Sequence, residues 1–578
     1  MPTAGQAPAL VVRKHSPLNA SVQLHSAWNF TMNKKNLSRL LAVTALNAAV
    51  LLPWAAALDV ERATIPELQA AMAQGTLTSE KLTAAYLARI AAYDKTGPAI
   101  NAVITPNPKA LEVARALDAE RKAGKVRGPL HGIPIVLKDN IDTFDLPTSG
   151  GSQLLAGSLP PDDAFVAKKL REAGCVIVAK VNLSEWAGSG GSIANVTDPE
   201  IVKAGAVPNG FSSMGGQTKN PHDLTRGPSG SSGGTGASIA ASFAQFGLGT
   251  DTGGSVRGPS SANGIVGLKT THGLVSRDGI IPLALSFDTC GPMARSVTDI
   301  AIALGVMAGV DPHDESTKKG EGKAETDYTK YLKTGSLKGA RIGIARDFMG
   351  RDAGTDVIVE AAIVKLRELG AIVVDQVRYS PYLLAAKQPI YGTLVAAEFK
   401  AQLTDYLKAK TKPGFPKSFD EVVALSNDPA TKYRSPGKAY GLKYNSTRTL
   451  DLTDPSYLAI KNEQLMAMKA GIDAIFATHQ LDAILYPTSP RPATPIEPPA
   501  NPTPGAGGDS PTSFANETGY PDLIVPAGMT KDGLPVTISF FGKAFSEPKL
   551  IGYAYDFEQA THAIAEPKTT PALPSDKL

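Results

Sequence analysis

Two small-residue loops decide the fold of this chain: Gly227-Pro-Ser-Gly-Ser-Ser-Gly-Gly-Thr-Gly236 and Gly249-Thr-Asp-Thr-Gly-Gly-Ser-Val-Arg-Gly258. Because glycine lacks a Cβ, such loops can bring their backbone N–H groups close to a ligand. Stretches of this composition are otherwise flexible linkers. Here the small apolar run 237–244 separates the loops and predicts a buried helix, and 265–270 predicts a strand. These flanks favour a packed site over a linker.

The two loops resemble the signature of the amidase signature family. The match extends from Gly227 to Ala294 and includes Gly264-Ile-Val-Gly-Leu-Lys269 and Gly291-Pro-Met-Ala294. The resemblance implies an α/β fold with a single amidase-signature domain, in which α-helices flank a large mixed β-sheet. It also implies an enzyme that hydrolyses an amide C–N bond to a carboxylate and ammonia through a Ser–Ser–Lys triad and an acyl-enzyme.

Amide hydrolysis needs an activated nucleophile, and a lysine can act as the base only in its neutral form. Lys138 ends the apolar run 133–137, and burial would lower its pKa by disfavouring the charged form. Asp139 would point to the opposite face of a strand. Taken by itself, Lys138 is an ordinary lysine at a strand end. However, His131-Gly-Ile-Pro-Ile-Val-Leu-Lys-Asp139 resembles the lysine-bearing segment of the family.

The resemblance also assigns the two serines. Ser255 is the expected nucleophile, and Ser231, which follows a cis peptide bond in the family, passes the proton between Ser255 and Lys138. The oxyanion hole is expected from the backbone N–H groups of Thr252, Gly253, Gly254 and Ser255. Three further residues are expected to support the site from beside the loops: Ser232, Asp251 and Arg257. For the two charged residues the alternative is a position on the exposed surface.

Other catalytic arrangements have less support in the sequence. A Ser–His–Asp triad is the common alternative, but none of the 8 histidines follows a nucleophile-elbow pattern, and His131 and His272 are interpreted as structural. The glycines at 230, 233, 234 and 236 lack the strand, helix and following acid of a nucleotide-binding loop. No Cys-x-x-Cys or histidine-rich cluster indicates a metal site. We therefore expect neither a metal ion nor an organic cofactor.

Three further segments resemble the bacterial peptide-amidase branch of the family, whose members remove the C-terminal amide nitrogen of peptides: 182–187, 215–221 and 273–282. Two departures concern the choice of substrate. Gly254 stands where an acidic residue is expected in that branch, and 195–210 is interpreted as an insertion near the cleft. Peptide C-terminal amides are the predicted substrate, and small aliphatic or aryl amides are the alternative.

Two other functions remain as alternatives. A subunit of an amidotransferase would channel ammonia to a partner in the cytoplasm, and a secretory leader argues against that role. A catalytically inactive, exported binding protein would not need Lys138, Ser231 and Ser255 intact. The expected partner is therefore a small-molecule or peptide amide, with no nucleic acid and no stable membrane association after signal cleavage.

The first 57 residues are predicted to be a leader, and residues 58–578 the amidase domain. Met32 opens a basic stretch, Leu40 to Pro53 is mostly apolar, and small residues follow at 55–57, which are the parts of a secretory signal. The apolar run is short for a membrane span. Residues 1–31 are interpreted as an over-long start upstream of Met32. We expect export to the periplasm or the medium; an uncleaved anchor, an amphipathic helix and a cytoplasmic protein are the alternatives.

The composition is that of a globular protein. Of 578 residues, 43% are hydrophobic and 19% are charged, which is sufficient for a large core. Five basic residues and no acid precede Asp59, so removing these five charges from the net charge of +4 leaves −1 for the remainder. A broad nucleic-acid-binding surface is therefore not expected. Cys175 and Cys290 are too few for a disulfide framework and are interpreted as separate buried thiols.

The rest of the pattern alternates strands with helices, as in an α/β sheet. Thr64-Ile-Pro-Glu67 predicts a helix start with a capping box. Predicted strands cover 132–139, 175–180, 265–270, 341–345, 371–375, 482–487, 522–525 and 534–540. Predicted helices cover 110–123, 164–173 and 356–369, and 387–462 is expected to be largely helical. Residues 490–511, rich in Pro and Gly, are predicted to form an exposed loop.

Overall fold

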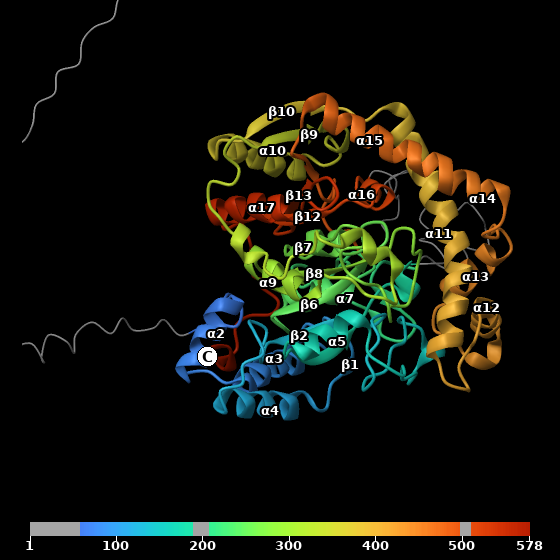
Figure 1. The fold of residues 1–578 in the computed structure, drawn as a ribbon. Helices are drawn as coiled ribbons and strands as arrows, with labels where there is room; N and C mark the ends of the chain where they lie inside the picture. The colour runs from blue at the N-terminus through green and yellow to red at the C-terminus, as the bar shows by residue number, and fades with distance from the viewer. Residues whose placement is uncertain (1–57, 189–206, 498–509) are drawn as a thin grey trace, which may run out of the picture. The chain divides into compact units, whose positions relative to one another are not determined.

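In the computed structural model, which describes residues 58–188, 207–497 and 510–578, an eleven-stranded sheet organises the fold (Figure 1). Its order is β1-β3-β2-β6-β8-β7-β12-β13-β11-β9-β10. The strands are β1 Val103–Pro106, β2 Pro134–Lys138, β3 Val176–Val181, β6 Phe246–Asp251, β7 Val266–Lys269, β8 Thr289–Ala294, β9 Arg341–Ala345, β10 Ile372–Val377, β11 Ala483–Pro487, β12 Asp522–Met529 and β13 Pro535–Phe541. β3, β2 and β6 are parallel, as are β11, β9 and β10, and antiparallel pairs join the two blocks. The predicted large mixed sheet is confirmed.

Helices cover both faces of the sheet near β2. They are α2 Ile65–Gln74, α3 Ser79–Tyr93, α4 Ala110–Lys122, α5 Phe165–Glu172, α7 Gly233–Ala240, α8 Arg257–Ala262 and α9 Val297–Met307. Ile135 and Leu137 of β2 pack into one core with α2, α3 and α9, whereas Val136 packs into a second core with α4 and α7. Side chains alternate between the faces of a strand. Lys138 therefore lies on the same face as Val136, toward α7.

Most predicted elements are confirmed to within a few residues. At the start of α2, the Thr64 N–H donates to Glu67 Oε2 at 2.8 Å, as the capping box predicts. The helix predicted at 237–244 begins earlier, at Gly233, and ends at Ala240, because Ser242 adopts a φ of 55° that a helix does not allow.

Two central strands, β6 and β8, are not predicted by the sequence. β6 contains two glycines and β8 contains Gly291-Pro292, and both residue types are usually depleted in strand interiors. In the structure every residue of both strands is buried, and Pro292 lies opposite Leu248 of β6. Burial between two helical layers therefore overrides the local preference.

The prediction of an exposed loop at 490–511 is wrong for part of its described residues. Pro490 and Ala493 are buried, and residues 488–494 line the cleft described below. Tertiary packing accounts for this, because Pro and Gly indicate an irregular backbone but do not indicate whether that backbone is exposed. Residues 1–57, 189–206 and 498–509 lie outside the described residues, and so does most of the insertion predicted at 195–210.

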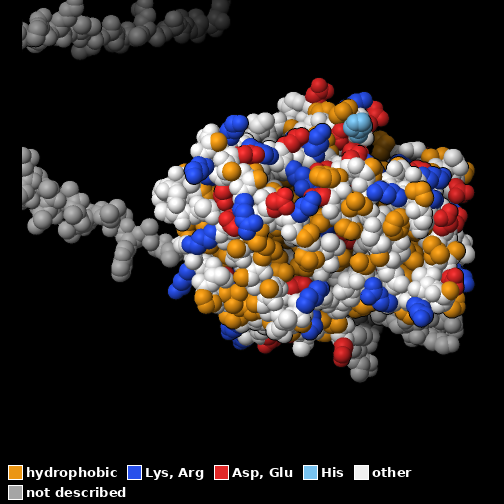
Figure 2. Space-filling model, turned by 90° about the horizontal axis from the view of Figure 1, so that it is seen from below, with side chains coloured by type: hydrophobic (Ala, Val, Ile, Leu, Met, Phe, Trp, Pro, Cys, Tyr) orange, Lys and Arg blue, Asp and Glu red, His pale blue; other side chains and the backbone are white. Residues whose placement is uncertain are grey.

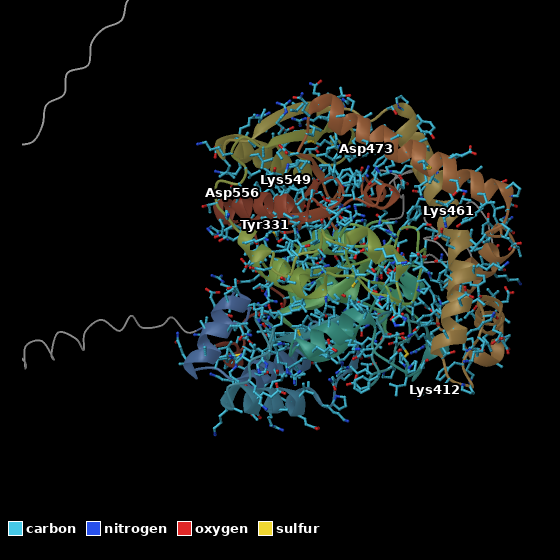
Figure 3. All side chains as sticks on the ribbon, viewed as in Figure 1. Tyr331, Lys412, Lys461, Asp473, Lys549 and Asp556 are labelled. Atoms are coloured by element: carbon cyan, nitrogen blue, oxygen red, sulfur yellow. The ribbon has the colours of Figure 1, made fainter. Side chains whose placement is uncertain are left out.

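A group of helices stands beside the sheet and confirms the helical prediction for 387–462 (Figure 1). It comprises α11 Pro381–Lys410, α12 Phe419–Asn427, α13 Pro436–Ser446, α14 Pro455–Ala459 and α15 Leu465–His479. The buried carboxylate of Glu398 in α11 accepts hydrogen bonds from the Tyr457 hydroxyl at 2.9 Å and from Lys461 Nζ at 3.1 Å. Figure 3 shows Lys461 beside α11 and Lys412 near the C-terminal end of that helix.

The remaining elements complete the sheet and its cover. They are α10 Ala353–Glu368, α16 Ser513–Thr518 and α17 Glu547–Thr561, with the two-stranded sheet of β4 Phe211–Ser212 and β5 Gly216–Gln217. Cys175 and Cys290 are separate buried thiols, as predicted. On the face drawn in Figure 2, basic and acidic side chains are interspersed without a broad patch of either sign. Within 58–188, 207–497 and 510–578, no helix is long and apolar enough to cross a membrane.

Residues near the two ends of the described domain are bonded to each other. The Leu578 N–H donates to the Leu58 carbonyl at 2.8 Å. Arg89 of α3 is fully buried and pairs with Glu61, at 3.0 Å, and with Asp576. Figure 1 marks the C-terminus beside α2, so the last residues close the structure against its first helices.

Candidate active site

The two signature loops lead into two short helices. Ser231 and Ser232 directly precede α7, and Ser255 lies just before α8. The peptide bond between Gly230 and Ser231 is cis, as the family resemblance implies. α7 packs so closely on β6 that a Cβ at Gly249 would lie 2.8 Å from Ser232 Oγ. The close approach lets the two loops bond directly, since the Ser232 N–H donates to the Ser255 carbonyl at 3.1 Å.

Lys138, the last residue of β2, reaches the first loop from inside the protein. Its Nζ lies 2.8 Å from Ser231 Oγ and 2.7 Å from Thr250 Oγ1, and the side chain is fully buried. Burial lowers the pKa of Lys138 to about 7, although Asp251 and Asp288 oppose that shift. Above that pH the amine is largely neutral and can accept a proton from the serine beside it.

Asp139 lies on the other side of the strand, as the alternation of side chains predicts. Its carboxylate is 3.4 Å from Lys180 Nζ and accepts the Ser149 N–H at 3.1 Å. Asp139 is therefore committed to a different lysine and does not hold Lys138 in its charged form.

Ser255 lines a cleft of about 350 Å³. The cleft is walled by Gly253 of the second loop, Tyr391 of α11, residues 488–494 and Thr512. Among the lining residues that the structure describes, Arg491 is the only charged one, and the others are apolar or neutral polar. A wall of this kind suits an uncharged carboxamide.

A buried ion-pair network holds the second loop. Asp251 Oδ1 is 2.9 Å from Arg257 Nη2, and Arg257 Nη1 is 2.9 Å from Asp522 Oδ2, with all three side chains fully buried. Burial opposes ionisation, but the Arg257 guanidinium brings the pKa of Asp251 well below its ordinary value. The Asp251 carboxylate also accepts the N–H groups of Gly254, at 2.8 Å, and Val256, at 2.9 Å. The alternative of an exposed surface is therefore wrong for Asp251 and Arg257, which fix the loop backbone.

The predicted donors of the oxyanion hole differ in their position and in whether their N–H groups are already bonded. Gly253, Gly254 and Ser255 line the cleft, whereas Thr252 is buried behind it with its hydroxyl bonded to Asp288. The Gly254 N–H is already used within the loop by Asp251. The other predicted donors are the backbone N–H groups of Thr252, Gly253 and Ser255.

Two residues of the site carry no motif in the sequence, Tyr391 and Thr512. Both lie far beyond the signature in the chain and reach the cleft from separate elements. The Thr512 hydroxyl donates to the Gly253 carbonyl at 2.7 Å, and the Thr512 carbonyl accepts from Arg257 Nη1 at 2.6 Å. Thr512 therefore ties the cleft wall to the nucleophile-bearing loop.

The two histidines singled out in the sequence are structural, as predicted. His131 Nε2 is 2.9 Å from the Leu117 carbonyl, and His272 Nε2 is 2.9 Å from the Leu285 carbonyl. In the part of the chain that the structure describes, no group of three or more His, Cys, Asp or Glu side chains is placed to hold a metal ion.

Comparison with known proteins identifies the family of this chain. The Amidase family model matches residues 81–551. An X-ray structure of native peptide amidase from Stenotrophomonas maltophilia is 41% identical, with a TM-score of 0.80 over 88% of this chain and 99% of that chain. A structure of the peptide amidase PAM with the competitive inhibitor chymostatin is 40% identical, with a TM-score of 0.78 over 88% and 99% of the two chains. A glutamyl-tRNA(Gln) amidotransferase subunit of Thermoanaerobacter pseudethanolicus is 35% identical over 87% of this chain and 98% of its own.

This chain therefore belongs to the amidase signature family. It is a hydrolase that acts on amide C–N bonds, and its substrate is an amide. Its relatives include a peptide amidase and a subunit of an amidotransferase.

Proposed function

We propose that this enzyme removes the amide nitrogen from C-terminal peptide carboxamides, with Ser255 as nucleophile, Ser231 as bridge and Lys138 as base. The 2.8 Å contact between Lys138 Nζ and Ser231 Oγ carries the proposal, because the lysine is fully buried and its pKa is lowered to about 7. The choice of peptide amides is supported by the likeness to peptide amidase and by the nearly uncharged cleft.

Acylation begins when Ser255 Oγ attacks the carboxamide carbon. The Ser255 proton moves to Ser231 Oγ, and the proton of Ser231 moves to neutral Lys138. The N–H groups of Gly253 and Ser255, which line the cleft, stabilise the oxyanion that forms. When the intermediate collapses, the C–N bond breaks, and the proton returns from Lys138 through Ser231 to the nitrogen, which leaves as ammonia.

Deacylation repeats the relay with water as the nucleophile. A water molecule attacks the ester carbonyl and gives its proton through Ser231 to Lys138. Collapse breaks the bond to Ser255 Oγ, which recovers a proton by the same path, and the acid product leaves as a carboxylate. Each half of the reaction uses the same base, so loss of one triad member should disable both halves.

The assignment can be tested by trapping the acyl-enzyme. Enzyme quenched in acid during turnover of a peptide amide should carry the acyl mass on the peptide that contains Ser255. Ser255→Ala should lose the adduct and leave only background ammonia release, and Ser231→Ala should be slower by roughly 10²–10⁴-fold. An adduct on another residue, or full activity in Ser255→Ala, would show that the assignment is wrong. Ammonia release that requires a co-purifying protein would instead favour the amidotransferase role.

We also propose that the protein is exported with cleavage near residue 57. The pattern from Met32 to Ala57 supports this proposal. N-terminal sequencing of the protein from its native cells should begin near Leu58. A cytoplasmic protein that retains Lys34 and Lys35 would contradict it.

A further inference from the structure

Tyr391 of α11 places a hydroxyl over the nucleophile-bearing loop. The side chain lines the same cleft as Gly253 and Ser255. Its ring stacks on the buried ring of Phe287, with the centroids 5.7 Å apart and the planes 21° from parallel. The hydroxyl is so close to Gly253 that a Cβ on that residue would lie 2.5 Å from it. The hydroxyl is therefore held at one position, next to the residues that meet the substrate.

No protein group among the described residues forms a hydrogen bond with this hydroxyl. Two buried tyrosines elsewhere in the described residues have partners: the Tyr86 hydroxyl donates to Gln245, and the Tyr457 hydroxyl donates to Glu398 at 2.9 Å. A tyrosine hydroxyl removed from water normally has a partner, because an unsatisfied polar group costs free energy. An unpaired hydroxyl in the wall of a cleft can obtain that partner from a ligand.

The electrostatic surroundings keep this hydroxyl protonated. Burial raises the pKa of Tyr391 above its ordinary value of 10, and the carboxylates of Asp251, Asp288 and Glu517 raise it further. The group therefore remains a neutral hydrogen-bond donor throughout the neutral pH range. Its O–H can then donate to an acceptor of a ligand, such as a carbonyl oxygen.

We infer that Tyr391 determines specificity by donating a hydrogen bond to a carbonyl oxygen in the acyl part of the substrate, beside the scissile carboxamide. The inference rests on the proposed hydrolysis of peptide amides. A peptide amide carries backbone carbonyls in that part, whereas a simple aliphatic amide has only the scissile carbonyl, whose oxygen lies at the loop N–H groups. The bond is therefore made with peptide amides alone and favours them over aliphatic amides.

Two matched substrates test this inference. N-acetyl-phenylalaninamide and 3-phenylpropanamide share the carboxamide and the ring, but the second lacks the acetamido carbonyl. Tyr391→Phe removes one oxygen atom and keeps the stacked ring. We expect kcat/KM for N-acetyl-phenylalaninamide to fall roughly 2- to 12-fold, the range for one neutral hydrogen bond, while kcat/KM for 3-phenylpropanamide stays unchanged.

Tyr379→Phe is the matched control. Its hydroxyl likewise has no hydrogen bond, but its ring packs on Phe514, with centroids 4.8 Å apart, and the residue is not part of the cleft lining. This control should leave both substrates unchanged. An equal loss on both substrates in Tyr391→Phe, or no loss on either, would overturn the inference. Wild-type enzyme that does not hydrolyse N-acetyl-phenylalaninamide would instead refute the proposed function on which the inference rests.

Discussion

Lys138 and Lys269 are both fully buried at the ends of strands, yet their hydrogen-bond partners differ. Burial lowers the pKa of each to about 7. Lys269 Nζ donates to the carbonyls of Thr270, at 3.0 Å, and Tyr520, at 2.9 Å, whereas Lys138 Nζ lies 2.8 Å from Ser231 Oγ. A carbonyl oxygen has no proton to give, but a hydroxyl can give one and take another. A lowered pKa therefore makes a lysine neutral near pH 7, but the lysine acts as a base only where a neighbouring hydroxyl can give it a proton.

The largest expected effect separates the two lysines by activity. Lys138→Met removes the proposed base, and kcat/KM on a peptide amide should fall by roughly 10²–10⁴-fold. Lys269→Met changes a similarly buried amine that touches only carbonyls, so most of the activity should remain. Ammonia release by the two purified variants provides the measurement. Similar losses in both would contradict the distinction drawn between them.

The pH dependence of the rate should follow Lys138 and not Lys269. The pKa of Lys138 is lowered to about 7, so the neutral base is lost as the pH falls below that value. In that range kcat/KM should decrease about tenfold per pH unit, since the rate follows the fraction of neutral lysine. Lys269→Met should keep the same acid limb. If the acid side of the pH–rate profile shifts in Lys269→Met, the rate depends on the protonation of Lys269 and not of Lys138.

Stability, by contrast, should respond to both lysines alike. Each pKa is about 7 in the folded protein and 10.5 as the ordinary value. Between these values the unfolded chain binds more protons, so the free energy of unfolding rises with pH there. Each lysine should contribute about 1.4 kcal/mol per pH unit in that window. Urea titrations across the window should show a shallower rise in either Met variant, and an unchanged slope in both would argue against the lowered pKa values.

The smallest effect is expected at the second hydroxyl beside Lys138. Thr250 Oγ1 lies 2.7 Å from Lys138 Nζ and also accepts from Asn140 Nδ2 at 3.1 Å. Thr250→Val keeps the shape of the side chain and removes this contact, so kcat/KM should fall by a factor of about 2–12. Thr250→Ser should restore the rate. A loss as large as that of Lys138→Met would place Thr250 in the proton path with Ser231.

Local patterns in the sequence predict much of the sheet but not its centre. The apolar run at 341–345 predicts a strand with the bounds that β9 has. β8 is missed because Gly291-Pro292 normally ends a strand, and only its burial between β6 and β7 keeps it in the sheet. Strands of this kind depend on contacts that are distant in the chain, which a local pattern does not contain.

The same limit applies to the candidate site. Lys138 and Lys269 both follow short apolar runs, so their local patterns do not distinguish a base from a structural lysine. The resemblance to a family singled out Lys138, and the fold supplied its contact with Ser231. Tyr391 and Thr512 join the site from elements far along the chain, and nothing in their flanking residues indicates a role.

The backbone hydrogen bond between Leu578 and Leu58 holds these two residues next to each other in the folded domain. A short covalent linker from residue 578 to residue 58 should therefore be tolerated, with new termini opened in a surface loop away from the cleft. The same geometry affects synthesis. Arg89 obtains its partner Asp576 only after residue 576 has been made. The contact between α3 and this segment therefore forms late in the synthesis of residues 58–578.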